Sequence, residues 1–326
     1  MFVPGSFTVA LVMTILSTIC WGSFANTFKL TRNYRFELYY WDYAIGIVLI
    51  AVVLALTMGS VHGGPDAFLA NVRSAAVSNL IYAAVGGFIF NIANVLLIAG
   101  IEIVGLAVAF PIAIGIALVE GVVLSYALQP KGNAALLAAG VIMAIVAVLL
   151  VGKAYGALRQ GEAGVSRRGV VICVVSGLLM GLFAPFVTRA MTSARPLTPY
   201  TVGVAFTVGA FLCCFVFNTY LMKRPLVGAP VGFAGYRQAS GTYHALGVLG
   251  GAIWGLGTVF NFVAASLVGV AISYAIGQAS PMVAALWGVF VWKEFRGSST
   301  RARMYLAGMF VSYVVALALI ASAYKA

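Results

Sequence analysis

The chain is divided into ten apolar stretches, each long enough for a helix to cross a bilayer, separated by short polar connections. A crossing takes about 20 mostly apolar residues, because lipid offers no partner to backbone polar groups and a helix satisfies them internally. The sequence therefore predicts an all-α membrane protein with ten transmembrane helices. The predicted spans are residues 7–27, 38–59, 79–100, 104–127, 134–152, 169–190, 199–221, 245–266, 269–292 and 304–323.

Charged residues are scarce and lie mostly in the connections between these stretches. They make up 8% of the chain, with 63% hydrophobic residues, whereas a soluble domain has roughly 25% charged residues to cover its surface. We therefore interpret the net charge of +12 as a signal of membrane topology and predict no nucleic-acid partner. The cysteines lie inside apolar spans and are interpreted as packing residues: Cys20, Cys173, Cys213 and Cys214.

The basic residues are divided unequally between the two sides of the membrane. Loops rich in Lys and Arg stay in the cytoplasm, so fourteen basic residues after the odd-numbered spans, against five elsewhere, predict external termini in a bacterial inner membrane. The fourteen are Lys29, Arg32, Arg35, Lys153, Arg159, Arg167, Arg168, Lys223, Arg224, Arg237, Lys293, Arg296, Arg301 and Arg303. The five are Arg73, Lys131, Arg189, Arg195 and Lys325.

The sequence also repeats itself. Residues 86–126 align without a gap on residues 250–290, a shift of 164, with Gly86-Gly87 opposite Gly250-Gly251. A unit of five helices is odd in number, so its second copy is inserted upside down, as in many secondary transporters. We predict a first repeat at residues 1–152, a cytoplasmic linker at 153–168 and an inverted second repeat at 169–326.

Residues suited to catalysis are missing from the predicted spans. His62 and His244 fall in or beside loops, so we expect no buried Ser-His or Cys-His arrangement and no metal cluster at membrane depth. A phosphate-binding loop ending in Lys-Ser or Lys-Thr is also absent from the sequence. The prediction is a protein that is not an enzyme, with no cofactor or metal, driven by a gradient.

Two acidic residues are candidates for proton coupling or gating. Glu120 lies well inside a span, where a carboxylate costs about 2.5 to 3.5 kcal/mol unless it pairs, protonates or faces a cavity. The alternative is an acid that joins two helices. Asp42 could act as a gate by pairing with Lys29, Arg32 or Arg35, or could be an interfacial acid beside an aromatic belt.

Uncharged polar residues near the middle of the membrane are the predicted substrate ligands. Asn91 and Asn94 are three residues apart on one helix, and Gln278 and Ser280 lie at the centre of another. Each could instead bond only to a neighbouring helix.

Mid-span prolines and tryptophans add to this prediction. Pro111 and Pro281 lie in helices that the repeat makes equivalent, and broken helices at matching positions are typical of transporter sites. Trp21 and Trp254 could stack on a substrate ring or serve only in packing.

The ninth span and the loop that follows it carry a recognisable motif. It reads Gln278-Ala279-Ser280-Pro281-Met282-Val283, then Trp287-Gly288, then Glu294-Phe295-Arg296-Gly297-Ser298-Ser299. It resembles the ureide permease family of the drug/metabolite transporter superfamily, which is related to bacterial glucose/ribose and rhamnose porters. Tyr40-Trp41-Asp42-Tyr43 is similar to that family's Tyr-x-Asp-Tyr. The resemblance also places Asn94 at the family's Gly-Asn and Asn261 at its Gln, which adds Asn261 to the predicted ligands.

The resemblance departs from the plant members of the family in the linker, since residues 153–168 are too short for their long cytosolic loop. It implies a drug/metabolite transporter fold and uptake of a small neutral polar solute. The predicted function is a secondary transporter for a ureide or nucleobase such as allantoin or uracil, coupled to protons. A monosaccharide porter and a non-transporting membrane protein are the alternatives. The expected partners are the small substrate, protons and membrane lipid, with a monomeric or homodimeric chain.

Overall fold

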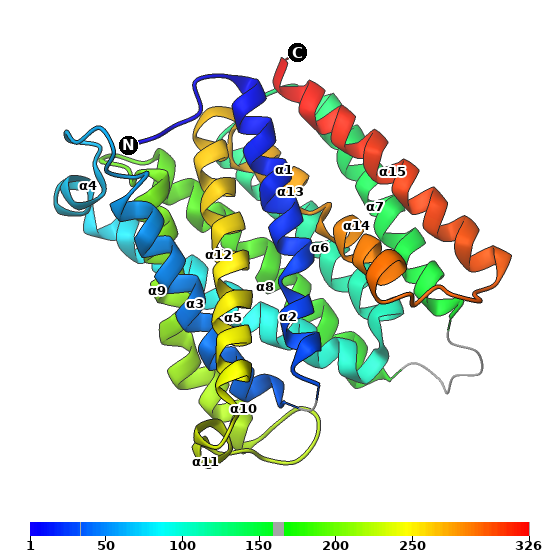
Figure 1. Ribbon diagram of the computed structural model, residues 1–326. Coiled ribbons are helices and arrows are strands. Elements are labelled where there is room, and N and C mark those ends of the chain that lie inside the picture. Colours follow the sequence, from blue (N-terminus) through cyan, green and yellow to red (C-terminus); the bar gives the residue numbers. More distant parts are fainter. Residues whose placement is uncertain (33, 159–165, 326) are drawn as a thin grey trace.

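The computed structural model describes residues 1–32, 34–158 and 166–325. In this part of the chain, ten helices are long and apolar enough to cross a membrane, which confirms the ten predicted spans. Arg159 and the rest of residues 159–165, within the predicted linker, lie outside the described residues. Figure 1 shows both termini at the same end of the bundle, as an even number of crossings requires. We name this end the terminal face and the opposite end the basic face.

The unbroken spans are α3 (Phe36–Leu56), α5 (Val77–Val104), α6 (Leu106–Leu128), α7 (Ala134–Gly156), α8 (Arg167–Thr192), α12 (Gly241–Val268) and α15 (Thr300–Lys325). The others are broken into α1 (Phe7–Ser23) with α2 (Ala25–Leu30), α9 (Pro199–Cys213) with η1 (Cys214–Asn218) and α10 (Thr219–Lys223), and α13 (Val270–Gly277) with α14 (Ser280–Leu286) and η2 (Trp287–Val291). Short helices α4 (Phe68–Ser74) and α11 (Phe233–Arg237) lie at opposite ends of the bundle (Figure 1).

Polar side chains fix the starts of several spans. Asn133 Oδ1 accepts hydrogen bonds from the backbone amides of Ala135 and Leu136 at 3.0 and 3.1 Å. Ser240 Oγ caps α12 in the same way through the amide of Thr242. A helix leaves its first amides without partners, so these oxygens set where each span begins.

Glycines let the longest helices cross their neighbours with backbones in contact. A Cβ at Gly87 of α5 would collide with the carbonyl oxygen of Phe206 in α9, and a Cβ at Gly251 of α12 would collide with that of Tyr43 in α3. Small residues at such crossings are how membrane helices gain van der Waals contact where lipid supplies no hydrophobic drive. The two crossings bring α3, α5, α9 and α12 together around the centre of the molecule.

Helices α5 and α12 have matching positions in the two halves. The bounds of α12 lie 164 residues after those of α5. Each helix ends at a glycine in a conformation that L side chains rarely adopt, with φ and ψ of 75° and 160° at Gly105 and 88° and 152° at Gly269. These glycines turn the chain directly into α6 and α13.

Candidate functional site

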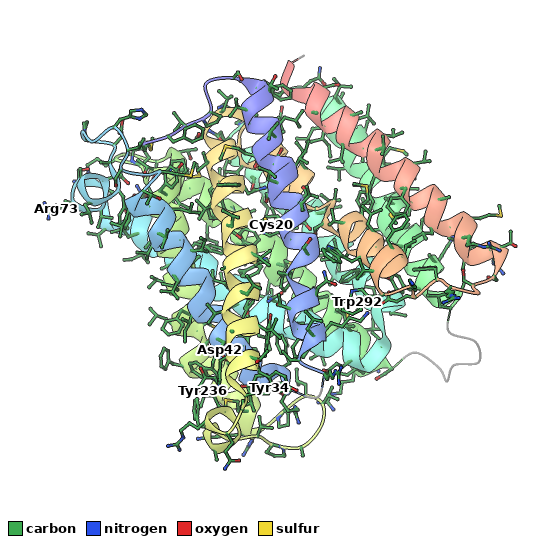
Figure 2. The ribbon with its side chains drawn as sticks, viewed as in Figure 1. Cys20, Tyr34, Asp42, Arg73, Tyr236 and Trp292 are labelled. Carbon is green, nitrogen blue, oxygen red and sulfur yellow. The ribbon has the colours of Figure 1, made fainter. Side chains whose placement is uncertain are left out.

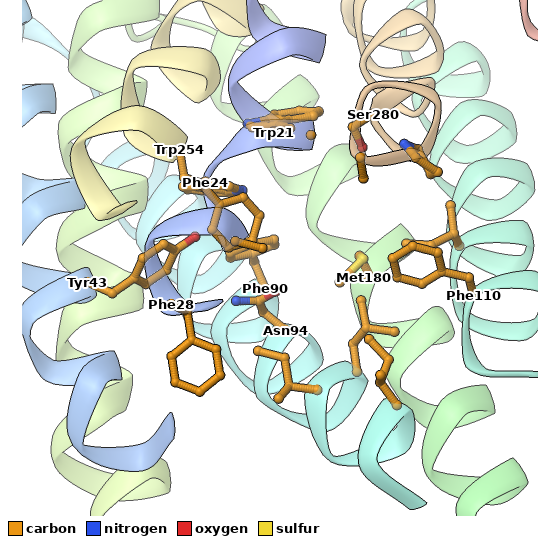
Figure 3. Close-up of a pocket in the computed structure, with 18 of the residues that line it drawn as sticks. Trp21, Phe24, Phe28, Tyr43, Phe90, Asn94, Phe110, Met180, Trp254 and Ser280 are labelled. Atoms are coloured by element: carbon orange, nitrogen blue, oxygen red, sulfur yellow. The ribbon is translucent and has the colours of Figure 1, made fainter. Parts of the chain in front are cut away.

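A cavity of about 220 Å³ lies between the two halves of the chain. It extends from Trp21, Trp254 and Gln278 in the middle of the bundle to Phe28, Phe36 and Ile101 near the basic face. Figure 3 shows its walls, with the aromatic cluster around Trp254 facing Met180, Phe110 and Ser280. The lining residues are Trp21, Gly22, Phe24, Ala25, Phe28, Phe36, Tyr39, Tyr40, Tyr43, Phe90, Asn94, Leu97, Ile98, Ile101, Phe110, Ile114, Met180, Phe183, Trp254, Gln278, Ser280, Pro281 and Ala284.

Two helix breaks border this cavity. The first separates α1 from α2 at Phe24, where the backbone angles stay helical, and the second separates α13 from α14 at Gln278 and Ala279. Helix breaks were predicted at both Pro111 and Pro281. The prediction is wrong for Pro111, because α6 continues through it. Pro281 does lie at a break, in the first turn of α14. A proline in the first turn replaces an amide that has no helical partner, so a new helix can begin there.

The cavity is neutral and has few polar groups. Gln278, Asn94 and Ser280 all line it, and none of its described lining residues is charged. Asn94 Nδ2 donates a 3.1 Å hydrogen bond to the hydroxyl of Tyr40. The Gln278 side chain makes no hydrogen bond with the residues that the structure describes and is 7% exposed. Its amide is therefore free to pair with a bound molecule.

Aromatic rings form one wall of the cavity. The indoles of Trp21 and Trp254 are stacked with centroids 6.1 Å apart, and Phe90 stacks on Trp254 at 4.6 Å. Trp21 Nε1 donates to Thr258 Oγ1 at 3.1 Å, which fixes the orientation of its ring. A fixed aromatic wall with a few amides suits a flat, uncharged polar molecule.

Two predicted ligands lie outside the cavity lining. Asn91 Oδ1 faces the Sγ of Cys214 at 3.9 Å instead of the cavity. Asn261 Nδ2 donates to the carbonyl oxygen of Ser273 at 3.0 Å, and Ser273 Oγ donates back to the carbonyl oxygen of Asn261 at 2.8 Å. Asn261 thus joins α12 to α13.

Glu120 is also outside the cavity lining. Its side chain packs where α6 meets α8, against Gly181. Its Oε2 atom is buried and has no hydrogen-bond partner among the described residues. The hydroxyl of Tyr274 lies nearby and donates to the carbonyl oxygen of Ala117, one turn before Glu120. The ring of Tyr274 contacts Phe183, a residue of the cavity wall, so Glu120 lies one layer of side chains behind it.

Asp42 has different partners from those predicted. It pairs with His244 of α12, whose Nδ1 lies 2.8 Å from Oδ2, and with Tyr236 of α11. The prediction of a pair with Lys29, Arg32 or Arg35 is wrong because the Asp42 side chain points toward α12, where Gly247 leaves room for it. Figure 2 shows Asp42, Tyr236 and Tyr34 gathered near the basic face.

The tyrosines around Asp42 are affected by its charge. Burial and the Asp42 charge raise the pKa of Tyr34 to about 12. Burial and the hydrogen bond to Asp42 raise the pKa of Tyr236 above its ordinary value. Both phenols are thus held in their neutral form, and Tyr236 serves as a hydrogen-bond donor.

Polar contacts join the ends of the first and ninth spans near the basic face. Lys29 forms an ion pair with Glu294, and the hydroxyl of Tyr155 donates to the same carboxylate at 3.1 Å. Trp292 Nε1 donates to Asn26 Oδ1 at 2.6 Å. These five residues line a second cavity, of about 450 Å³, that adjoins the first beside α2 and α14. They connect the first half of the chain to the second near the basic face.

Several residues of the cavity wall were not among the ligands predicted from the sequence. Tyr39, Tyr40 and Tyr43, interpreted as an interfacial belt, are each 1% exposed and line the cavity from α3. Phe24 and Phe90 line it from α1–α2 and α5. The available signal was the spacing of the tyrosines, since residues three and four apart share one face of a helix.

Comparison with known proteins bears on this arrangement. The family model described as ureide permease matches residues 39–161 and 164–323. Ureide permease 1 of Arabidopsis thaliana is 23% identical over 344 residues, covering 86% of this chain and 87% of that protein. Ureide permease 5 of the same plant is 29% identical over 126 residues, a match that spans 38% of this chain but only 30% of the relative's length.

A solved crystal structure is also similar. It is 17% identical, covers 95% of this chain and 98% of its own, and has a TM-score of 0.59, which shows a shared fold. The family match covers most of the chain and includes the α3 tyrosines, Asn94 and the α13–α14 break. This chain is a multi-pass integral membrane protein that belongs to the ureide permease family, a family of transporters and not of enzymes.

Proposed function

We propose that the protein is a secondary transporter for a small, neutral, planar solute of the ureide or nucleobase type, bound in the central cavity. The observation that carries this proposal is the free amide of Gln278 in a neutral cavity with an aromatic wall. An amide offers two donors and one acceptor, which match the alternating N–H and C=O edge of allantoin or uracil. The names of the plant relatives point to the same substrate class.

The monosaccharide alternative depends on carboxylates near the substrate, because sugar hydroxyls are commonly bound by acids as well as amides. Glu120 is outside the cavity lining, and no described lining residue is charged. A ureide or nucleobase is therefore favoured over a sugar as the substrate.

We further propose that the chain consists of two five-helix units inserted in opposite orientations, which would alternate access to the cavity. The support is a pair of matching contacts between the two halves. Gly46 of α3 meets the carbonyl oxygen of Val248 in α12, and Gly209 of α9 meets that of Ala84 in α5. Ala84 and Val248 are separated by the same shift of 164 residues as the bounds of α5 and α12. With the basic face in the cytoplasm, the cavity would face inward in this conformation.

Proton coupling is the proposed energy source, with Glu120 as the proton site and Asp42 as a gating residue. Glu120 is a half-buried acid whose buried Oε2 atom has no hydrogen-bond partner among the described residues, and it lies behind a cavity wall that carries no charge of its own. A carboxylate in that position can take up and release a proton without touching the substrate.

The test is uptake by proteoliposomes of labelled allantoin, uracil, glucose, ribose and rhamnose, with and without an inward proton gradient. Liposomes without protein are the control. We expect saturable uptake of allantoin or uracil, increased by the gradient. Uptake of the sugars alone would contradict the proposal.

A further inference from the structure

Three tyrosines of α3 face the central cavity, and their hydroxyls differ in one respect. The Tyr39 hydroxyl lies 2.6 Å from Thr27 Oγ1, and the Tyr40 hydroxyl accepts the 3.1 Å hydrogen bond from Asn94. The Tyr43 hydroxyl is buried and has no hydrogen-bond partner among the described residues. A buried hydroxyl without a partner is uncommon in a folded protein and calls for a physical reason.

The position of Tyr43 supplies such a reason. Several buried polar side-chain atoms lack a described partner, but Tyr43 is the one such residue that also lines the central cavity. The other residues with such atoms, among them Asn91 and Glu120, do not line the cavity. Of these unpaired groups, the Tyr43 hydroxyl is therefore the one placed to meet a molecule bound there.

The surroundings of Tyr43 are aromatic. The ring of Phe24 lies 5.5 Å from that of Tyr43, and Trp254 lies 6.4 Å away. Figure 3 shows Tyr43 reaching from α3 toward both of these rings. Phe24 lies between α1 and α2, and its backbone is helical, with φ of −56° and ψ of −37°. The Phe24 side chain is only partly buried, so it can move by a change of rotamer without a change of the backbone.

We propose that the Tyr43 hydroxyl is a substrate-binding group that forms a hydrogen bond with the solute when Phe24 moves aside. It would face the solute from α3, while Gln278 faces it from the α13–α14 break. Selectivity would follow, because a solute without a carbonyl or N–H toward Tyr43 would leave the hydroxyl unpaired. This inference rests on the proposed function of the cavity and adds a residue that determines specificity.

The test uses two variants that each remove one oxygen. Tyr43→Phe removes the unpaired hydroxyl at the cavity, and Tyr200→Phe removes an unpaired buried hydroxyl of α9 that does not line the cavity. Binding of allantoin and uracil to the purified full-length protein is measured by calorimetry, and the melting temperature is measured alongside. We expect Tyr43→Phe to raise Kd about tenfold without lowering the melting temperature, since no hydrogen bond within the protein is lost. Tyr200→Phe should also keep the melting temperature, but should change Kd less than about twofold.

The outcomes separate this inference from the proposed function. If the wild-type protein binds neither allantoin nor uracil, the proposed function fails and the inference fails with it. If the wild-type protein binds one of them and Tyr43→Phe binds it equally well, only the role of Tyr43 is overturned. A similar rise in Kd for both variants would also overturn it, because the effect would then not depend on the position of the hydroxyl at the cavity.

Discussion

The hydroxyl of Tyr236 donates a 2.6 Å hydrogen bond to Oδ1 of Asp42, a carboxylate that is only 3% exposed. The other carboxylate oxygen faces His244, so one acid connects α3, α11 and the start of α12. A buried carboxylate with two close partners is costly to disturb, because removing a partner leaves charge without compensation. This contact fastens the connection between α10 and α12 to the bundle.

Loss of the Tyr236 hydroxyl should loosen that connection. In Tyr236→Phe, trypsin should cut faster after Arg237, a basic residue of this connection, while the transmembrane core stays intact. Tyr243→Phe is the matched control, because its ring packs on Tyr34 and its hydroxyl makes no hydrogen bond to a described residue. Equal cleavage rates in Tyr236→Phe and the wild-type protein would show that the hydrogen bond does not fasten the loop.

Alkaline pH should weaken the same region. The pKa of Tyr34 is raised to about 12, above its ordinary value of 10.0, so its neutral form is favoured by folding. That contribution is fully present below pH 10.0 and is lost as the pH rises through about 12. The melting temperature should fall over this range, and Tyr34→Phe should reduce the fall because it has no proton to lose. A fall of the same size in both proteins would assign it to other groups.

The glycine crossings should tolerate no side chain. Gly87→Ala places a methyl group against the carbonyl oxygen of Phe206, so we expect a loss of about 1 to 3 kcal/mol of stability, the range for overpacking. Gly115→Ala in α6 is the control, because a Cβ there would meet nothing within 4 Å. The melting temperatures of the two variants, measured in the same detergent, test this expectation. A Gly87→Ala protein as stable as Gly115→Ala would mean that α5 and α9 are not in backbone contact.

Glu120 offers a test of energy coupling. If it carries the coupling proton, Glu120→Gln should abolish proton-driven accumulation in proteoliposomes but retain exchange of labelled for unlabelled solute, which needs no net proton movement. Counterflow and gradient-driven uptake are measured on the same preparation. Full gradient-driven uptake by the variant would leave Glu120 as an acid that only joins α6 to α8.

The spans could be predicted because lipid imposes one rule on every residue of the backbone. The side chains of the site could not all be predicted, because the polarity of a residue does not show whether its side chain points into the cavity or toward a neighbouring helix. Asn91 and Asn94 are three residues apart, yet only Asn94 lines the cavity. Asn261 is equally polar and bonds to Ser273 instead. Asp42 lies nearer in sequence to Arg35 than to His244, yet the packing of α3 on α12 through small residues brings His244 to it.

The aromatic residues of the site could not be predicted from the sequence for a similar reason. A tyrosine near a membrane boundary is usually an interfacial residue. Tyr40 and Tyr43 are instead 1% exposed, because α12 and α9 pack against α3 inside the bundle. Their burial depends on crossings that the sequence alone does not locate.

The most direct test of the proposed site is the affinity of Gln278→Ala for allantoin or uracil. Gln278 lines the cavity and makes no hydrogen bond to a described residue, so its loss should weaken binding by about one to two decades and leave the melting temperature unchanged. Asn261→Ala should show the opposite pattern, with a lower melting temperature and a nearly normal Kd, because Asn261 bonds to Ser273. A normal Kd in Gln278→Ala would contradict the assignment of the cavity as the substrate site.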